Sequence, residues 1–358
     1  MYYCGIAKNS EEKKTAAKLA STIFQKEENE FKQISLLDNP NLKNVVIIKS
    51  SENKIIGTAF LVERFFPRDG RSIKGTFISS ICIHEQWRKK GLSTLLINKC
   101  CDLAYKNKSL LAIVIARRKV DYYYNQYGFW GIGNYNIIVM KNDFKNTFSD
   151  LNEVDVKISD LMTCSNLYKK TYKNLYGHCR RSIKKWQYIL QKKSYQKLNF
   201  CLYKYGNKNI GYSVIDNEGS IHELSFSSNP DGKKIIYHLM SKNNQKEIVL
   251  NLHSNHPILD IKFNFDISLK SRECYFGGHM IKPLDVKKLF LENEKQKINY
   301  LNKNNIITRY SKKTQCNEKI NSLGDLQKLL RICRFNYKNE ELIFDNCMPF
   351  NIPLLDQI

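Results

Sequence analysis

A basic segment with one glycine, Arg88-Lys89-Lys90-Gly91-Leu92-Ser93, separates two ordered runs of the sequence. The apolar run 75–83 predicts a strand, and the amphipathic run 94–106 predicts a helix. Backbone N–H groups at a helix N-terminus point in one direction and the helix dipole adds positive charge, so such a junction can bind a phosphate group. Gly91 would let the main chain approach that anion closely, and Ser93 could donate a hydroxyl hydrogen bond. The alternative is a basic turn before an ordinary amphipathic helix.

A tyrosine-rich segment farther along the chain reads Tyr123-Tyr124-Asn125-Gln126-Tyr127-Gly128-Phe129. The pattern predicts a short helix that ends at Gly128, preceded by a buried strand over 110–116. Together the two segments resemble the GNAT (Gcn5-related N-acetyltransferase) superfamily, whose pyrophosphate loop reads Arg/Gln-x-x-Gly-x-Gly/Ala and whose later segment reads aromatic-Tyr-x-x-x-Gly-Phe. Ser93 takes the place of the last small residue of that loop, and Arg117 stands where many relatives carry Asn.

This resemblance implies acetyl-coenzyme A (acetyl-CoA) as the acyl donor. In such enzymes the pantetheine arm pairs with the central strand, here at Ile81, Cys82 and Ile83, where a backbone N–H polarises the thioester carbonyl. An acceptor amine attacks directly, so Cys82 is expected to be a small buried residue rather than a nucleophile. The expected coenzyme-binding residues are Ile81, Cys82, Ile83, Arg88, Lys89, Lys90, Gly91, Leu92, Ser93, Arg117 and Tyr124.

Tyr124 corresponds to the tyrosine that protonates the departing thiolate in this family, so the resemblance implies that it is the general acid. A core aromatic in a tyrosine-rich helix is the alternative, and Tyr122 and Tyr123 are candidates if the alignment shifts by one residue. No motif marks the general base. The nearest candidates to the predicted strand ends are Glu63, His84 and Glu85, although exposed glutamates are usually only solvated.

The second half extends the resemblance to the Eis-like branch, in which two acetyltransferase folds are fused in tandem. The residues that carry it are Arg181, Trp186, Gly211-Tyr212, Ile221-His222-Glu223-Leu224, His256-Pro257 and Gly278-His279-Met280. At the place of the phosphate loop this half reads Ser227-Ser228-Asn229-Pro230-Asp231-Gly232-Lys233-Lys234, which lacks the loop spacing. It is therefore expected to wall the acceptor pocket without binding coenzyme. Because the C-terminal carboxylate acts as base in Eis-like enzymes, Ile358 is a further catalytic candidate.

These elements predict an α+β (α/β layered) protein of tandem GNAT folds, each a mixed, mostly antiparallel sheet flanked by helices. The order hairpin, strand, helix, strand occurs in both halves, which indicates a diverged duplication. We expect a catalytic acetyl-CoA-binding domain at 1–150, a degenerate second GNAT-like domain at 151–290 and a C-terminal extension at 291–358. The extension is shorter than the third, sterol-carrier-like domain of full-length Eis-like proteins.

The composition excludes several classes of protein. Hydrophobic residues make up 42% of the 358 residues, too many for a disordered chain. The 11 cysteines, an odd number without a C-x-x-C pair, favour reduced thiols over a disulfide framework or a zinc site, and the scattered histidines predict no metal. The sequence contains no apolar stretch long enough to span a membrane and no secretory signal, so we expect a cytoplasmic protein.

The charge balance, 58 Lys and Arg against 34 Asp and Glu, gives a net charge of +24 and favours an anionic partner. Lys greatly outnumbers Arg, the better residue for bidentate phosphate recognition, and the excess of Lys, Asn and Ile is typical of an AT-rich coding genome. The expected acceptor is therefore a small-molecule amine, and a phosphorylated or nucleotide-linked amino sugar suits the charge.

Other interpretations stay open at this point. A non-catalytic protein that keeps the fold and associates with nucleic acid or the ribosome is less favoured, and its binding would weaken steeply with salt. A longer acyl-CoA, or a polyamine or aminoglycoside acceptor, would keep the enzyme class and change the substrate. The sequence is compatible with an oligomer.

Overall fold

The computed structural model describes most of the chain up to residue 285 and four short strands beyond it. The described residues are 2–36, 44–68, 71–116, 121–131, 133–141, 151–175, 177–195, 198–242, 247–253, 255–263, 267–274, 278–285, 308–310, 317–319, 335–338 and 341–344. Two small hairpins lie in the last part: β15 (Thr308–Tyr310) with β16 (Asn317–Lys319), and β17 (Phe335–Lys338) with β18 (Glu341–Phe344).

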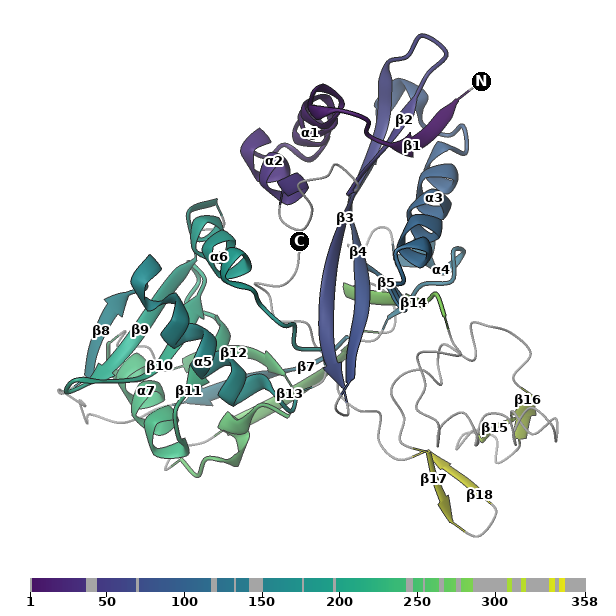
Figure 1. The fold of residues 1–358 in the computed structure, drawn as a ribbon. Helices are drawn as coiled ribbons and strands as arrows, with labels where there is room; N and C mark the ends of the chain where they lie inside the picture. The colour runs from purple at the N-terminus through teal and green to yellow at the C-terminus, as the bar shows by residue number, and fades with distance from the viewer. Residues whose placement is uncertain are drawn as a thin grey trace.

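The first large sheet has seven strands in the order β1-β2-β3-β4-β5-β14-β6. Their bounds are β1 (Tyr3–Ile6), β2 (Val45–Lys49), β3 (Ile55–Arg68), β4 (Arg71–Ile83), β5 (Leu111–Ala116), β14 (Gly278–Pro283) and β6 (Trp130–Gly131). The long hairpin β3–β4 crosses the centre of the molecule (Figure 1). β4 and β5 are parallel, whereas the other neighbouring strands of this sheet are antiparallel.

Helices cover both faces of this sheet. On one face lie α1 (Ser10–Phe24) and α2 (Glu28–Leu36), and on the other lies α3 (Leu92–Lys106) (Figure 1). The small buried face of α1, which contains Ala16 and Ala20, allows it to pack closely on the strands. The chain leaves α1 at Gln25, whose φ of 53° is left-handed, and restarts as α2.

The second large sheet also has seven strands, in the order β13-β7-β12-β11-β10-β9-β8. Their bounds are β13 (Ile267–Cys274), β7 (Gly133–Lys141), β12 (Glu247–His253), β11 (Ile221–Phe226), β10 (Lys208–Ile215), β9 (Asn199–Tyr205) and β8 (Leu151–Asp155). On one face lie α5 (Leu161–Tyr172) and α6 (Ile183–Tyr195), and on the other lies α7 (Asn229–Lys242). The strands β8 to β12 thus repeat the arrangement of β1 to β5, which confirms the predicted fold class.

The two sheets exchange one strand in each direction. β7 lies between β12 and β13 of the second sheet, and β14 lies between β5 and β6 of the first. The predicted first domain, 1–150, contains β7 in its sequence, but the structure places this strand in the second sheet. An apolar strand can satisfy its hydrogen bonds beside any neighbour of suitable length, so its pattern does not specify which sheet it joins. The domain boundary predicted near residue 150 follows chain order, whereas strand pairing crosses it in both directions.

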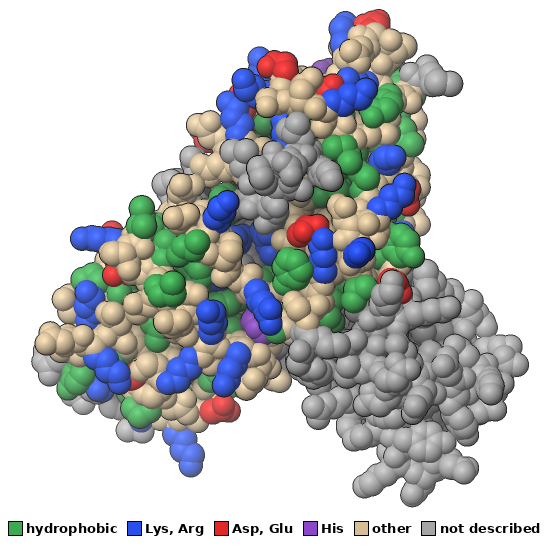
Figure 2. Space-filling view, in the orientation of Figure 1, with side chains coloured by type: hydrophobic (Ala, Val, Ile, Leu, Met, Phe, Trp, Pro, Cys, Tyr) green, Lys and Arg blue, Asp and Glu red, His purple; other side chains and the backbone are tan. Residues whose placement is uncertain are grey.

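The surface of the described residues carries dispersed positive charge. In the view of Figure 2, Lys and Arg side chains are spread over both halves rather than gathered along one element. None of the described helices is both long and apolar enough to cross a membrane.

Candidate functional site

β4 and β5 form a fork in the middle of the first sheet. They pair only from Gly75–Leu111 to Phe77–Ile113, although β4 continues to Ile83 and β5 to Ala116. The β3–β4 pairing contains a β-bulge in the part of β4 that no longer pairs with β5. A single β3 residue, Ala59, stands opposite Ser80 and Ile81, and Ser80 has a φ of 52°. Because a bulge bends and twists its strand, it accounts for the separation of β4 from β5.

The fork exposes the main chain of β4 along one edge. The N–H of His84 donates to Ile56 of β3 at 2.8 Å. Because consecutive strand residues direct their N–H and C=O groups to opposite sides, those of Ile81 and Ile83 are directed toward the fork. The Ile83 carbonyl accepts the Arg88 Nε–H at 3.2 Å, while Ile81 has no partner in the β3–β4 ladder. This edge can therefore accept a ligand that hydrogen-bonds like an extra strand.

The N-terminus of α3 opens beside this fork. Its N-cap is Gly91 with a φ of 71°, no side chain caps it, and no acidic residue lies in its first turn. A Cβ atom built on Gly91 would meet nothing within 4 Å, so space is open above the helix end. Among the described residues, no acceptor faces the N–H groups of residues 92–94. Open N–H groups and the helix dipole favour an anion at this position.

Basic side chains surround this helix end. Arg88 is joined to the strand end through Ile83, and its Nη2 lies 3.7 Å from the exposed Glu85 carboxylate. Lys89 and Lys90 are exposed, and the Lys90 ammonium lies 4.6 Å from the centre of the Trp87 ring. The sequence prediction that this segment forms a phosphate cradle is thus supported by its backbone geometry as well as by its charge.

Tyrosines connect this cradle to the short helix α4 (Asp121–Asn125). The Tyr127 hydroxyl lies 2.9 Å from Thr94 Oγ1 and donates to the Tyr123 hydroxyl at 3.0 Å. Tyr124 packs edge-on against Phe129, and no described residue hydrogen-bonds to its hydroxyl. Burial raises the pKa of Tyr124 to about 12, so its phenol is protonated at neutral pH. Of the tyrosines in α4 whose side chains are described, Tyr124 is the one whose hydroxyl has no hydrogen-bond partner among the described residues.

The carboxylates predicted as bases lie apart from each other. Glu63 forms an ion pair with Lys74 at 2.6 Å, and Lys74 Nζ also donates to the Asn107 carbonyl at the C-terminal end of α3 at 2.8 Å. A helix of 15 residues is ~22 Å long, so Glu63 and Gly91 mark opposite ends of α3. Glu85 is exposed next to the cradle. The general base therefore stays a prediction without a geometric assignment.

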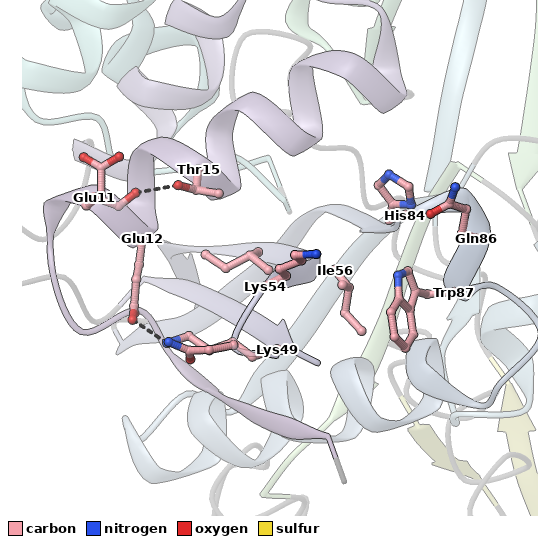
Figure 3. A pocket seen from close by; sticks show the side chains of 11 residues that line it. Glu11, Glu12, Thr15, Lys49, Lys54, Ile56, His84, Gln86 and Trp87 are labelled. Atoms are coloured by element: carbon pink, nitrogen blue, oxygen red, sulfur yellow. Dashed lines mark hydrogen bonds and ion pairs between the residues drawn. The ribbon is translucent and has the colours of Figure 1, made fainter. Parts of the chain in front are cut away.

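His84 lines a separate pocket of about 510 Å³ on the α1 side of the sheet (Figure 3). The pocket lies between α1, the β2–β3 turn and the segment that follows β4. Within it, the carboxylate of Glu12 is held by Lys49 Nζ at 2.6 Å, which lowers the pKa of Glu12. None of the residues that line the pocket belongs to the fork or to α4. The His84 side chain thus lines a pocket that is separate from the fork.

Cys82 is buried in the first sheet, and burial raises its pKa to about 12. A thiol with such a pKa supplies almost no thiolate, which agrees with the expectation that Cys82 is not a nucleophile. Arg117 and Ile358 lie outside the described residues, as does the side chain of Tyr122. The sequence interpretation missed the Ser80 bulge and the hydroxyls of Thr94 and Tyr127. The adjacent Ser79 and Ser80 inside an apolar strand were the available signal.

The corresponding fork of the second sheet is filled by side chains. β11 and β12 are parallel and pair at Ile221–Leu250. Beyond that point, the Leu224 N–H donates to the Tyr172 hydroxyl at 3.4 Å, and His256 Nε2 donates to the Leu224 carbonyl at 2.9 Å. The Phe226 N–H donates to Thr171 Oγ1 at 3.2 Å. These contacts occupy the strand edge that is open in β4.

The N-terminus of α7 is also closed. The Ser228 hydroxyl donates to Asp231 Oδ2 at 2.7 Å, the Ser227 hydroxyl donates to the same oxygen, and the Asp231 N–H donates to Ser228 Oγ at 3.3 Å. Asp231 is buried, so its negative charge stands at the helix end in place of an external anion. No set of His, Cys, Asp and Glu side chains suited to a metal ion occurs in the described ranges.

Comparison with known proteins relates the first half to a sequence family. Residues 14–129 match the model of the acetyltransferase (GNAT) family. No curated protein matches the chain. A GCN5-related N-acetyltransferase from Anabaena variabilis is similar in structure, with a TM-score of 0.62 and 14% identity over 80% of this chain and 74% of that one.

Two further solved structures share the arrangement. A conserved protein of unknown function from Enterococcus faecalis has a TM-score of 0.64 and 13% identity, over 81% of this chain and 74% of that one. Eis1 from Mycobacterium abscessus has a TM-score of 0.59 and 12% identity, over 80% of this chain and 74% of that one. At these identities the likeness shows a common fold, which extends over both sheets.

Proposed function

We propose that this chain, which belongs to the GNAT family through residues 14–129, transfers an acetyl group from acetyl-CoA to the primary amine of a small molecule. The observation that carries the proposal is the open α3 N-terminus beside the β4–β5 fork, with the Tyr124 hydroxyl uncommitted nearby. Within one sheet, this arrangement offers an anion site, an unpaired strand edge and a proton donor.

The residues of the first sheet fit a coenzyme with a pyrophosphate and an amide-containing arm. The N–H groups of residues 92–94, together with Lys89 and Lys90, would hold the pyrophosphate, and the open space at Gly91 accommodates it. The fork-facing groups of Ile81 would hydrogen-bond the arm. A main-chain N–H at the bulge would stabilise the negative charge that develops on the thioester oxygen during attack.

The chemistry follows from the protonation states of the groups present. The neutral amine attacks the thioester carbon, the new C–N bond forms, and the C–S bond breaks. Tyr124, protonated because burial raises its pKa to about 12, donates a proton to the departing sulfur. The phenolate regains a proton from solvent, and the amine nitrogen loses one, so the products are an amide and a free thiol. Cys82 does not carry the acyl group, since burial raises its pKa to about 12.

A short acyl group suits the closed end of the fork. The last paired residues of β4 and β5 are Phe77 and Ile113, and both side chains are buried. A longer chain would have to leave through a face of the sheet. The net charge of +24 favours an anionic acceptor, such as a phosphorylated or nucleotide-linked amino sugar, over a polyamine or aminoglycoside. On the face shown in Figure 2, the Lys and Arg side chains of the described residues are dispersed and form no continuous track for a nucleic acid.

Calorimetric titration with acetyl-CoA tests the proposal, followed by release of free thiol with a panel of amines. We expect micromolar binding by the wild type and loss of binding in Gly91→Glu, because the new carboxylate occupies the anion position. Gly91→Asn is the matched control, since Asn tolerates a positive φ and adds no charge. Absence of acetyl-CoA binding by the folded wild type would overturn the proposal, and steeply salt-dependent RNA binding would replace it with the nucleic-acid alternative.

A further inference from the structure

Helix α4 is too short to hold its own position. It contains five residues, Asp121–Asn125, and isolated helices shorter than ~12 residues are marginal in water. Its orientation must therefore come from contacts with the rest of the sheet. This matters for function because α4 carries Tyr124, the proton donor of the proposed reaction.

A hydroxyl group of α3 anchors this helix. Thr94 Oγ1 lies 2.9 Å from the Tyr127 hydroxyl. Tyr127 in turn donates to the Tyr123 hydroxyl at 3.0 Å. Since Tyr127 donates there, Thr94 supplies the proton in its own bond with Tyr127. The result is a chain of hydroxyls from the first turn of α3, which is the anion cradle, to α4.

The turn after α4 transmits this anchoring to Tyr124. The Tyr124 carbonyl accepts the N–H of Tyr127 at 3.1 Å and that of Phe129 at 3.2 Å. Gly128 permits this tight turn with a φ of 83°, and Phe129 is fully buried. The main chain of Tyr124 is thus fixed to residues whose own positions depend on the Tyr127 ring and its hydroxyl.

We propose that Tyr127 is a positioning residue, whose hydroxyl joins α3 to α4 and holds Tyr124 at the fork. The inference rests on the proposed function, because it assigns Tyr124 the role of proton donor. It also couples the cradle to the proton donor, because Thr94, which contacts the Tyr127 hydroxyl, lies in the turn that would contact the coenzyme phosphates.

The test is Tyr127→Phe, alone and combined with Tyr124→Phe, with Tyr105→Phe as the matched control. Tyr105 lies on α3 and is 55% exposed, so its hydroxyl contributes nothing to this chain. In Tyr127→Phe we expect kcat to fall about tenfold, because roughly one hydrogen bond that positions Tyr124 is lost. The Kd for acetyl-CoA should stay within about threefold of the wild-type value. In the Tyr124→Phe background the same change should have no further effect on kcat.

Equal losses of kcat in both backgrounds would overturn the inference, because Tyr127 would then act independently of Tyr124. Unchanged kcat in the single variant would overturn it as well, while wild-type turnover would leave the proposed function intact. Amide hydrogen exchange provides a readout that needs no turnover. We expect faster exchange over 123–129 in Tyr127→Phe than in the wild type or Tyr105→Phe, and equal rates would contradict the anchoring role.

Discussion

The two halves of the molecule carry the same junction of strand and helix, and they satisfy its polar groups differently. In the first half, α3 starts at an uncapped Gly91 and the β4 edge is open at Ile81. In the second half, α7 starts beside Asp231, and Tyr172 and His256 hydrogen-bond to the edge of β11. Buried polar groups must find partners, either within the protein or in a ligand. In the second half these partners lie within the protein. In the first half the polar groups are open, so this half is the one suited to bind a ligand.

The same contrast extends to the strands that lead into the two forks. In the second half, Glu223 of β11 is fully buried and holds Arg181 through two hydrogen bonds of 2.7 and 2.6 Å. Tyr212 donates to the same carboxylate at 2.6 Å, and the guanidinium lies 3.9 Å from the Tyr168 ring centre. β4 lacks a buried ion pair among its described residues, and its polar main chain is open. A duplicated fold thus contains one half whose polar groups are satisfied internally, the structural half, and one half that we propose binds the coenzyme, the binding half.

Breaking the buried ion pair should have the largest effect. Glu223→Gln removes the carboxylate charge that pairs with Arg181 in the interior, so we expect the free energy of unfolding to fall by about 3–5 kcal/mol. Each sheet contains one strand from the other half of the sequence, β14 in the first sheet and β7 in the second. We therefore expect urea denaturation to show one cooperative transition for the two sheets. Glu218→Gln, on an exposed turn, is the control and should stay within about 0.5 kcal/mol of the wild type. Two separate transitions would contradict the coupling of the sheets.

A carboxylate introduced into the first turn of α3, at the position that Asp231 has in α7, should weaken anion binding at this helix end. Thr94 is the third residue of α3, as Asp231 is of α7. In Thr94→Asp we expect the affinity for acetyl-CoA to fall about 100-fold, because the new charge repels the pyrophosphate at close range. Calorimetry measures this loss, and Thr94→Asn separates charge from the lost hydroxyl. Similar affinities in the two variants would show that the first turn of α3 does not contact an anion.

The His256 contact should make the second half sensitive to acid. Burial and the nearby His253 lower the pKa of His256 from 6.5 to about 3, so the folded protein binds fewer protons than the unfolded chain at intermediate pH. The contribution of neutral His256 to the free energy of unfolding is fully present above pH 6.5. It is lost as the pH falls toward 3, by about 1.4 kcal/mol per pH unit.

The measurement is urea denaturation of wild type and His256→Gln at pH 7 and pH 5. Gln can still donate to the Leu224 carbonyl but does not titrate in this range. We expect the wild type to lose about 2 kcal/mol more than the variant between the two pH values. Equal losses would mean that His256 is not buried as a neutral donor at the β11 edge.

Several features of the site followed from local sequence. The cradle at 88–93 and the Tyr123–Phe129 segment were recognisable because glycine, charge and aromatic spacing act within one turn of chain. Both helices were predicted, but their boundaries differ by a few residues: α3 begins at Leu92 rather than at 94, and α4 ends at Asn125, three residues before Gly128. Proximity in sequence was the basis for the three base candidates, and the structure separates them. Glu63 forms an ion pair, His84 lines a separate pocket, and Glu85 is exposed.

The sequence by itself determined the repeated order of elements, the basic helix start in one half and its absence in the other. Tertiary structure decided which sheet β7 and β14 join, where β4 departs from β5, and which side chains fill the second fork. The physical reason is the range of the interactions. Helix caps and turns depend on neighbouring residues, whereas strand partners and the filling of a strand edge depend on groups far apart in sequence that only packing brings together.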